Sequence, residues 1–415
     1  MSDRDALLAT IHERPEDDVA RLVFADWLEE HDEIELGQFI RNDVLAAALP
    51  ANHPARLRYE LVDKPKLERS PEVQAHLPRI PGGASWVGPP YFQRGFPNGI
   101  EINFSHAAAT PNKIAYERTL ANKLIARVGS WPIDSLLTSP WKDRLNTIEL
   151  IGYQMPNTHI RRLLDTPFPA LKSLSISFDA ISIMHMDALI QAGLFWGLES
   201  FTVSTIPAGR RICETLMRQR ATNLKRLTLH RTRLPSEMLF NLLQSNAVPS
   251  LEHLAVGGDF PASGSLFVAV SGIVDGYRLR SFLAVGSSMG MNGATALAEC
   301  QGLEDLEELS LSACVIHAVE MQILVGSMHF RNVHRLDLSR NPIGDEGARA
   351  IADSRNFPSL LVLDLQYAQI GDDGFQAIVN SPLANQLVML YAANNPISVG
   401  MRLRLESRFR DRVVV

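Results

Sequence analysis

A Leu-x-x-Leu-x-Leu pattern recurs along most of this chain, and its period restricts the fold more than any other feature. The first position of each copy falls, in order, at Leu145, Leu171, Leu198, Leu224, Leu251, Leu279, Leu306, Val333, Leu360 and Leu387. Successive copies are 26 to 28 residues apart. A constant period in this range is typical of solenoids, in which a unit too small to bury its own apolar face is completed by its neighbours.

The copy at residues 333–343 indicates what one unit forms. Its apolar positions alternate and predict a strand that ends in a turn, where Asn341 is expected to bond neighbouring backbone groups. The run 344–347 then predicts a helix start with Asp345 as N-cap, because acidic groups favour the positive end of a helix. Glycines at 293, 347 and 374 share one repeat position and predict close helix packing.

Residues 306–397, and less closely 145–290, resemble leucine-rich repeats of the ribonuclease-inhibitor type. Cys314 stands at a position that takes Asn or Cys in such repeats, and we expect it to be a small buried residue. The resemblance implies an α/β solenoid, a horseshoe with a parallel inner sheet and outer helices, preceded here by a small all-helical domain.

Residues 3–47 predict that helical domain, with Ser2 or Asp3 capping its first helix and the run 15–18 capping the second. Through Arg21-Leu-Val-Phe-Ala-Asp-Trp-Leu-Glu-Glu30 and the shorter matches around it, this stretch resembles the bacterial repeat-companion domain. No activity is established for that family, so the resemblance implies architecture only. Its charged residues either form a recognition surface or pair within the domain around a core Trp27; the second is the expectation for Arg21, Asp26, Glu30 and Arg41.

Composition shifts divide the chain into four expected parts: 1–49, helical domain; 50–97, Pro-rich linker and docking segment; 98–397, solenoid; 398–415, C-terminal cap. The aromatic-rich stretch 84–97 is expected to dock on the first solenoid coil. The run 99–104 alternates like a strand, and 113–128 is interpreted as a helix. At the other end, 399–409 predicts a capping helix and 413–415 an edge strand.

Charge and composition favour a cytoplasmic protein that binds neither nucleic acid nor membrane. The net charge is −6, and the longest apolar stretch is too short for a membrane span. Residues 1–36 hold 12 acidic and 3 basic side chains, whereas 401–412 hold five arginines. These ends are interpreted as a solvated helical face and a basic cap, with a head-to-tail contact between molecules as the alternative. The three cysteines have no metal-ligand spacing.

Strand positions between the buried leucines are expected to face the concave side and to bind a protein partner. They form a basic band near residue 226, an acidic band near 308, and an exposed aromatic and methionine patch near the C-terminus, a composition expected of interface centres. The candidate partner-binding residues are Lys225, Arg226, His230, Arg231, Glu307, Glu308, Arg335, Asp337, Asp364, Tyr367, Met389 and Tyr391. Cover of Met389 and Tyr391 by the C-terminal tail is the competing interpretation.

Motifs for catalysis are weak. Asp337 and Asp364 share a row, near the carboxylate separation of retaining glycosidases, about 5 Å, but an open sheet cannot exclude water. The glycines between 286 and 293 match no phosphate-binding loop. We therefore expect a non-enzymatic interaction scaffold without cofactor or metal. The alternatives are a GTPase-activator-like regulator, since Ran-activating proteins share such repeats, and a structural spacer or homo-oligomer.

Overall fold

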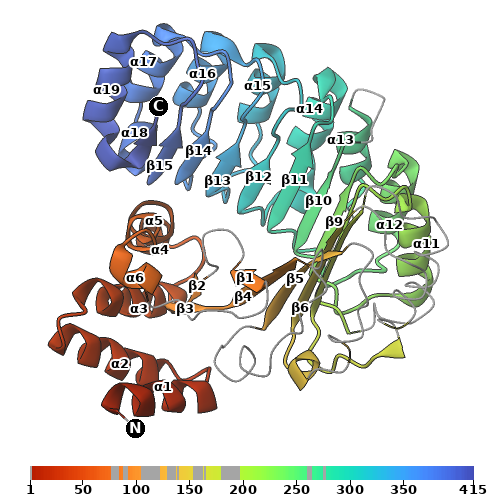
Figure 1. The fold of residues 1–415 in the computed structure, drawn as a ribbon. Helices are drawn as coiled ribbons and strands as arrows, with labels where there is room; N and C mark the ends of the chain where they lie inside the picture. The colour runs from red at the N-terminus through yellow and green to blue at the C-terminus, as the bar shows by residue number, and fades with distance from the viewer. Residues whose placement is uncertain are drawn as a thin grey trace. The chain divides into compact units, whose positions relative to one another are not determined.

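The structure is a computed structural model of the chain, and it describes residues 2–75, 84–86, 92–103, 122–128, 137, 140–152, 162, 165–178, 197–258, 264–273 and 277–415. The chain forms two compact units, Met1–Ala192 and Gly193–Val415 (Figure 1). The first contains a helical region and the first strands of the repeats. The second contains regular strand–helix repeats. The two units are described separately.

Helices α1 (Asp3–Glu13), α2 (Asp18–Glu30) and α3 (Ile34–Ala47) open the first unit. Ser2 and Asp17 cap α1 and α2 by accepting hydrogen bonds from backbone amides, as the sequence predicts. Their apolar faces enclose a core that includes Ile11, Phe24, Leu28, Leu36 and Phe39. Trp27 packs against this core at its edge, half-buried, with its ring stacked on His31 at 4.0 Å between centroids.

The segment that follows packs onto the same helices. Short helices α4 (Pro54–Arg58), η1 (Tyr59–Asp63), α5 (Lys64–Leu67) and α6 (Pro71–Ala75) bury Leu57 and Val73 completely. Residues 54–75, expected within a linker, therefore belong to the helical core.

The aromatic segment divides between two sites. Strand β1 (Ala84–Trp86) pairs antiparallel with β4 (Gly99–Asn103), the first repeat strand. The hairpin of β2 (Phe92–Gln93) and β3 (Phe96–Pro97) instead packs on α3, with the rings of Phe39 and Phe92 edge to face at 4.8 Å. At its turn the Gly95 amide donates to Asp43 Oδ2 at 2.7 Å. Gly95 has a φ of 78°, and an added Cβ would lie 2.6 Å from Ile40 Cα. Strand β1 thus docks on the first coil, whereas the hairpin packs on α3 and reaches the coil through Gln93, whose Oε1 accepts from Asn98 Nδ2 at 2.6 Å.

The first unit's sheet has the order β1-β4-β5-β6-β7, with β5 at Lys123–Val128, β6 at Thr147–Gly152 and β7 at Ser173–Phe178. All pairs after β1 are parallel. The helix predicted over 113–128 is wrong at 123–128, which is strand β5; residues 113–121 lie outside the described part of the chain. The short apolar run in Lys-Leu-Ile-Ala-Arg-Val fits either a helix or a strand, and pairing with β4 and β6 selects the strand.

Repeat strands continue in the second unit in the order β8 to β16, each described pair parallel. They are β8 (Ser200–Ser204), β9 (Arg226–His230), β10 (His253–Gly257), β11 (Ser281–Val285), β12 (Glu308–Ser310), β13 (Arg335–Asp337), β14 (Val362–Asp364), β15 (Met389–Tyr391) and β16 (Val413–Val414). From Leu145 to Leu387, the first leucine position of every predicted copy lies two residues before a strand.

Helices follow these strands and line one side of the sheet (Figure 1). They are α11 (Gly209–Gln219), α12 (Ser236–Gln244), α13 (Ser265–Val270), α14 (Gly290–Ala298), α15 (Ala318–Val325), α16 (Gly344–Asp353), α17 (Asp372–Asn380), α18 (Leu383–Gln386) and α19 (Val399–Phe409). Short helices η2 (Pro140–Asp143), η4 (Gln301–Leu303) and η5 (Arg410–Arg412) complete the described elements. Gly293 approaches Gly264 so closely that an added Cβ would meet its Cα at 2.8 Å, so it is a packing position.

Each turn out of the sheet uses the same backbone geometry. One residue per repeat has a φ between 52° and 81°, at Thr205, Arg231, Gly258, Gly286, Ala313, Arg340, Tyr367 and Asn394. Beside this position Asn341 is fully buried, donates to Leu311 O at 2.8 Å and accepts from Ile316 N at 3.1 Å. The turn role predicted for Asn341 is confirmed.

Neighbouring repeats cap each other's helices. Asp345 does not cap its own helix α16, whose N-cap is Ile343. Its Oδ1 accepts instead from Gly371 N at 2.7 Å and Gly374 N at 3.1 Å, at the start of α17. Asp372 Oδ1 likewise accepts from Ser398 N at 2.8 Å, just before α19. The prediction that Asp345 caps its own helix was therefore wrong. Because the repeats stack, Asp345 and Asp372 each lie beside the start of the helix in the next repeat.

Candidate functional site

Strand side chains of the second unit alternate between the helix layer and the opposite, inner face. In β9, Leu227 and Leu229 are buried under the helices, while Arg226 is exposed and Thr228 and His230 are half-buried. The inner-face positions form rows across the sheet, because the strands are parallel and in register. Adjacent members of a row are about 5 Å apart.

The candidate residues fall into two separate groups on this face. Lys225, Arg226, His230 and Arg231 lie on and beside β9. The others lie on strands β12 to β15, except Glu307, directly before β12, and Tyr367, in the turn after β14: Glu307, Glu308, Arg335, Asp337, Asp364, Tyr367, Met389 and Tyr391. Strands β10 and β11 separate the groups, so β9 and β12 are roughly 14 Å apart.

Charges in the row before the strands alternate in sign, which the sequence interpretation overlooked. This row contains Glu199, Lys225, Glu252, Arg280 and Glu307. Lys225 Nζ lies 3.1 Å from Glu199 Oε2, and Arg280 Nε donates to Glu307 Oε1 at 3.1 Å. The expected basic and acidic bands are therefore partly neutralised by their neighbours. A comparison of the residues directly before each predicted strand, one repeat apart, would have predicted Glu199 as the partner of Lys225 and Arg280 as the partner of Glu307.

The group at β12–β15 is continuous. In one row Glu308, Arg335, Val362 and Met389 are register partners; in the next, Ser310, Asp337, Asp364 and Tyr391. Met389 is only 5% exposed, so its expected place on an exposed patch is wrong: it is buried beside Val362, also buried. Tyr391 is half-buried, and burial followed by the Asp364 charge raises the pKa of its hydroxyl.

Tyr367 is the most exposed aromatic residue of this group, at 46%. The Arg340 guanidinium lies over its ring, 4.7 Å from the centroid. The two side chains thus form a cation–π pair at the rim of the inner face.

The carboxylates of Asp337 and Asp364 have structural partners. Each accepts, at 2.9 Å, the amide of the residue two positions later, Ser339 or Gln366, and so closes a turn. Burial raises the pKa of Asp364, and the neighbouring Asp337 charge adds to the shift. Both residues therefore hold the strand ends in place.

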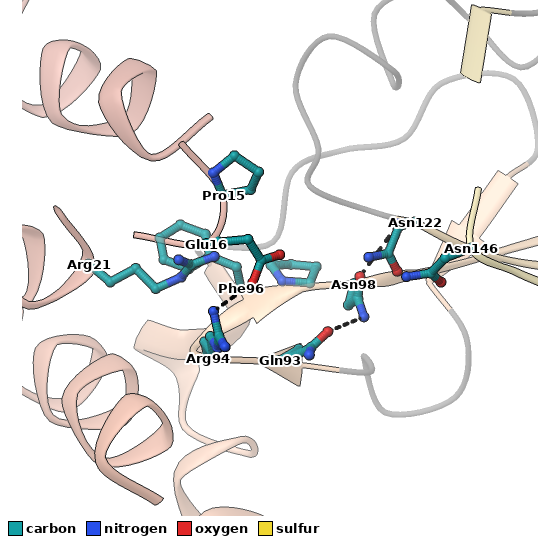
Figure 2. Close-up of a pocket in the computed structure, with 10 residues that line it drawn as sticks. Pro15, Glu16, Arg21, Gln93, Arg94, Phe96, Asn98, Asn122 and Asn146 are labelled. Carbon is teal, nitrogen blue, oxygen red and sulfur yellow. Dashed lines mark hydrogen bonds and ion pairs between the residues drawn. The ribbon is translucent and has the colours of Figure 1, made fainter. Parts of the chain in front are cut away.

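A second candidate site is a polar pocket within the first unit, about 140 Å³ in volume (Figure 2). One wall is the turn between α1 and α2 with Arg21, and another is the β2–β3 hairpin with Arg94. The third is a row of asparagines, Asn98, Asn122 and Asn146, each directly before a repeat strand. We call this set the asparagine row. Its 24-residue spacing extends the repeats back to β4, a signal that the sequence interpretation missed.

Charged groups in this pocket are close together. Arg94 Nη1 lies 3.0 Å from Glu16 Oε2 and 3.5 Å from Asp18 Oδ1. Arg21 is 4% exposed, lies over the Phe96 ring, and approaches Asp18 no closer than 3.8 Å. Burial lowers the pKa of Arg21 despite the nearby carboxylates. The predicted pairing of Arg41 is also present, to Asp26 and Glu29 on the same helical region.

The three cysteines are free thiols buried in the protein. Cys314 is fully buried, and burial raises the pKa of its thiol to about 12, as expected for an inert residue. Within the described residues, no cluster of His, Cys, Asp and Glu is placed to hold a metal ion. No helix in that part of the chain has the length and apolar character needed to cross a bilayer.

Comparisons with known proteins agree with this geometry. Residues 330–352 and 358–379 match a family model described as leucine-rich repeat. Among solved structures, the chain is similar to one in the crystal structure of the Rad7 and Elc1 complex in yeast, at 16% identity over 96% of this chain and 95% of that chain, with a TM-score of 0.56. The fold is a leucine-rich-repeat solenoid. The predicted α/β solenoid class, with a helical N-terminal region, is confirmed.

Other comparisons add less. An internalin (inlF) from Listeria monocytogenes matches at 14% identity over 77% of this chain and 86% of its own, with a TM-score of 0.37. The comparison with curated proteins gives no match. The leucine-rich-repeat architecture therefore rests on the two matched repeats, the Rad7 likeness and the register described above.

Proposed function

We propose that this protein is a non-enzymatic scaffold that binds a protein partner on the inner face of its leucine-rich repeats. The contact centre lies between β12 and the turn after β15. The single observation that carries this proposal is the continuous group of Arg335, Asp337, Asp364 and Tyr391, bordered by the exposed Tyr367. Tyrosine and arginine are enriched at the energetic centres of interfaces.

The polar groups of this face are held in place by the fold. Ser281 Oγ donates to Glu308 Oε2 at 2.8 Å, and Ser310 Oγ donates to Asp337 Oδ2 at 2.7 Å. Side chains that are already ordered lose little entropy on binding. The Rad7 chain, which shares the fold, was crystallised in a complex with Elc1, and this supports a protein as the class of partner.

Partner capture tests this proposal. The full chain would be used to isolate partners from native lysate, and the affinity of each would be measured for Tyr391→Ala and Arg335→Ala. We expect each variant to weaken binding at least tenfold, or about 1.4 kcal/mol. Arg349→Ala, on the exposed face of α16, is the matched control and should bind normally. Normal affinity in all three variants would place the site elsewhere; in that case Arg226→Ala and Arg231→Ala examine the β9 group.

The finer identity of the repeats belongs to the same proposal. Their strand-plus-helix unit supports the ribonuclease-inhibitor type, and helices α1–α3 support a repeat-companion-like domain. The bacterial origin that we propose follows from the sequence resemblance of residues 21–30 to that family. We propose a cytoplasmic location, repeats over 98–397 and a C-terminal cap at 398–415; residues 54–75 and the β2–β3 hairpin share the core of the helical domain, so the expected boundary at residue 49 is not retained. Localisation of the tagged chain and limited proteolysis test these two points.

A further inference from the structure

The pocket of the first unit contains a buried positive charge whose compensation is incomplete. Arg21 is 4% exposed, and its Nε is buried without a hydrogen-bond partner among the described residues. Its Nη1 donates to Asp17 O at 3.3 Å and lies 3.8 Å from Asp18 Oδ1. Asp18 Oδ1 is also buried without a hydrogen-bond partner among the described residues, but at 3.8 Å it does not contact Arg21 directly. A buried guanidinium is costly unless paired, so this arrangement favours an acceptor within hydrogen-bond distance of Arg21.

The guanidinium of Arg94 already binds a carboxylate, and that carboxylate belongs to an exposed side chain, Glu16. Glu16 has 85% of its side chain exposed, yet its Oε2 lies 3.0 Å from Arg94 Nη1 (Figure 2). Arg94 itself has a φ of 51° at the hairpin turn, an uncommon backbone conformation that the docked hairpin maintains. Glu16 therefore marks the position where a carboxylate from another molecule fits, and because it lies in the turn between α1 and α2, its side chain can move away without disturbing either helix.

The opposite wall offers amide groups in a line. In the asparagine row, backbone atoms stack across β4, β5 and β6: Asn146 N donates to Asn122 O at 2.9 Å. Asn98 Nδ2 donates to Gln93 Oε1 at 2.6 Å, which joins this row to the hairpin. Side-chain amides at the spacing of neighbouring strands can both donate to and accept from peptide groups.

We propose that this pocket binds the carboxylate of an extended peptide segment, held by Arg21 and Arg94, with the adjoining peptide groups against the asparagine row. Planar guanidinium groups match a carboxylate in a bidentate arrangement. The carboxylate is either a chain terminus or an Asp or Glu side chain. Phosphate fits less well, because Asp18, which remains beside the two arginines, repels a dianion more strongly than a single carboxylate.

Blocked peptides distinguish these sources. The probes are N-acetyl-trialanine with a free terminal carboxylate, its terminal amide, and N-acetyl-Ala-Asp-Ala amide, titrated against the full chain by ligand-observed NMR. We expect the terminal or the side-chain carboxylate to bind with a roughly millimolar Kd, and the uncharged amide about tenfold more weakly. Whichever carboxylate peptide binds more tightly identifies the source.

Variants of the pocket complete the test. Arg94→Gln should weaken carboxylate binding about tenfold, and Glu16→Gln should strengthen it, because the internal competitor is removed. Arg14→Gln, an exposed arginine just before the same turn that does not line the pocket, is the control and should bind as the natural chain does. Arg21→Met should weaken binding as well; if circular dichroism shows that this buried variant is unfolded, Arg94→Gln and Glu16→Gln decide. Equal affinity for the free acid and the amide, or equal loss in Arg14→Gln and Arg94→Gln, would overturn the proposal.

Discussion

Replacing Asp345 by alanine removes the acceptor that caps α17 from the preceding repeat. The N-cap residue of α17 is Gly371, which has no side chain to accept from the free amides of the first turn. Asp345 Oδ1 replaces that missing group, with hydrogen bonds from Gly371 N at 2.7 Å and Gly374 N at 3.1 Å. In the alanine variant, these half-buried amides lose their acceptor.

The expected cost follows from two contributions. Loss of an N-cap acceptor destabilises a helix by about 1 kcal/mol. Loss of a negative charge beside the positive end of the helix adds about 0.5 to 1 kcal/mol in a partly buried position. We therefore expect the free energy for opening of α17 to fall by about 2 kcal/mol, which corresponds to roughly 30-fold more frequent opening.

Hydrogen exchange followed by mass spectrometry measures this locally, which suits a repeat array whose global unfolding need not be two-state. Peptides from α17 report the effect, and peptides from α15 serve as an internal reference. Asp345→Asn keeps an oxygen acceptor without the charge and should lose about half as much. Glu346→Ala, an exposed neighbour in the first turn of α16, is the matched control and should change exchange in α17 little.

The reasoning would be refuted if α17 exchanged hydrogen at the same rate in Asp345→Ala and in Glu346→Ala. Such a result would mean that water satisfies the amides of Gly371 and Gly374 as well as the carboxylate does. Faster exchange in α16 alone would also contradict it, since that outcome returns Asp345 to the role of a cap for its own helix.

Three further predictions concern stability. Asn341→Ala leaves buried backbone groups without partners and should lower the free energy of unfolding by about 2 to 4 kcal/mol, read from chemical denaturation of the last repeats. Val315→Asn should raise thermal stability by about 0.5 to 1 kcal/mol, because a β-branched residue is strained at a φ of 55°; no gain would show that the turn tolerates valine. Burial lowers the pKa of His12 and His253, so the unfolded chain takes up protons first as the pH falls below about 6.5. The melting temperature should therefore fall when the pH is lowered from 7.5 to 5.5, and it should fall less in His253→Asn. An equal fall in the natural chain and in the variant would contradict this.

The regular part of the fold is predictable from sequence because an apolar residue, almost always leucine, lies just before each of its strands, so the leucines recur at the length of one repeat. The same logic identified the turn role of Asn341. It failed at 123–128, where the step between strands shortens to 24 residues and the marker is asparagine rather than leucine. A local hydrophobic pattern cannot separate a strand from a helix there; only the pairing of β5 with β4 and β6 does.

The candidate sites were less predictable, because they depend on contacts between repeats. Which charges are compensated depends on neighbours 26 or 27 positions away, as for Lys225 with Glu199 and Arg280 with Glu307. Met389 is buried, and its register partner on the neighbouring strand is the buried Val362, 27 positions earlier in the sequence. The pocket joins Arg21 to Arg94, 73 positions later in the sequence, and neither residue type nor spacing indicates that meeting.

In each turn, the residue with left-handed backbone angles keeps its conformation although its side chain differs from repeat to repeat. Its backbone angle bends the chain out of the sheet, and glycine, alanine, arginine, tyrosine, threonine and asparagine all adopt it in this one molecule. The side chains at these positions consequently vary without altering the path of the chain. Substitutions at these turn positions can therefore change which side chains are presented along this border of the sheet while the backbone of the solenoid stays the same.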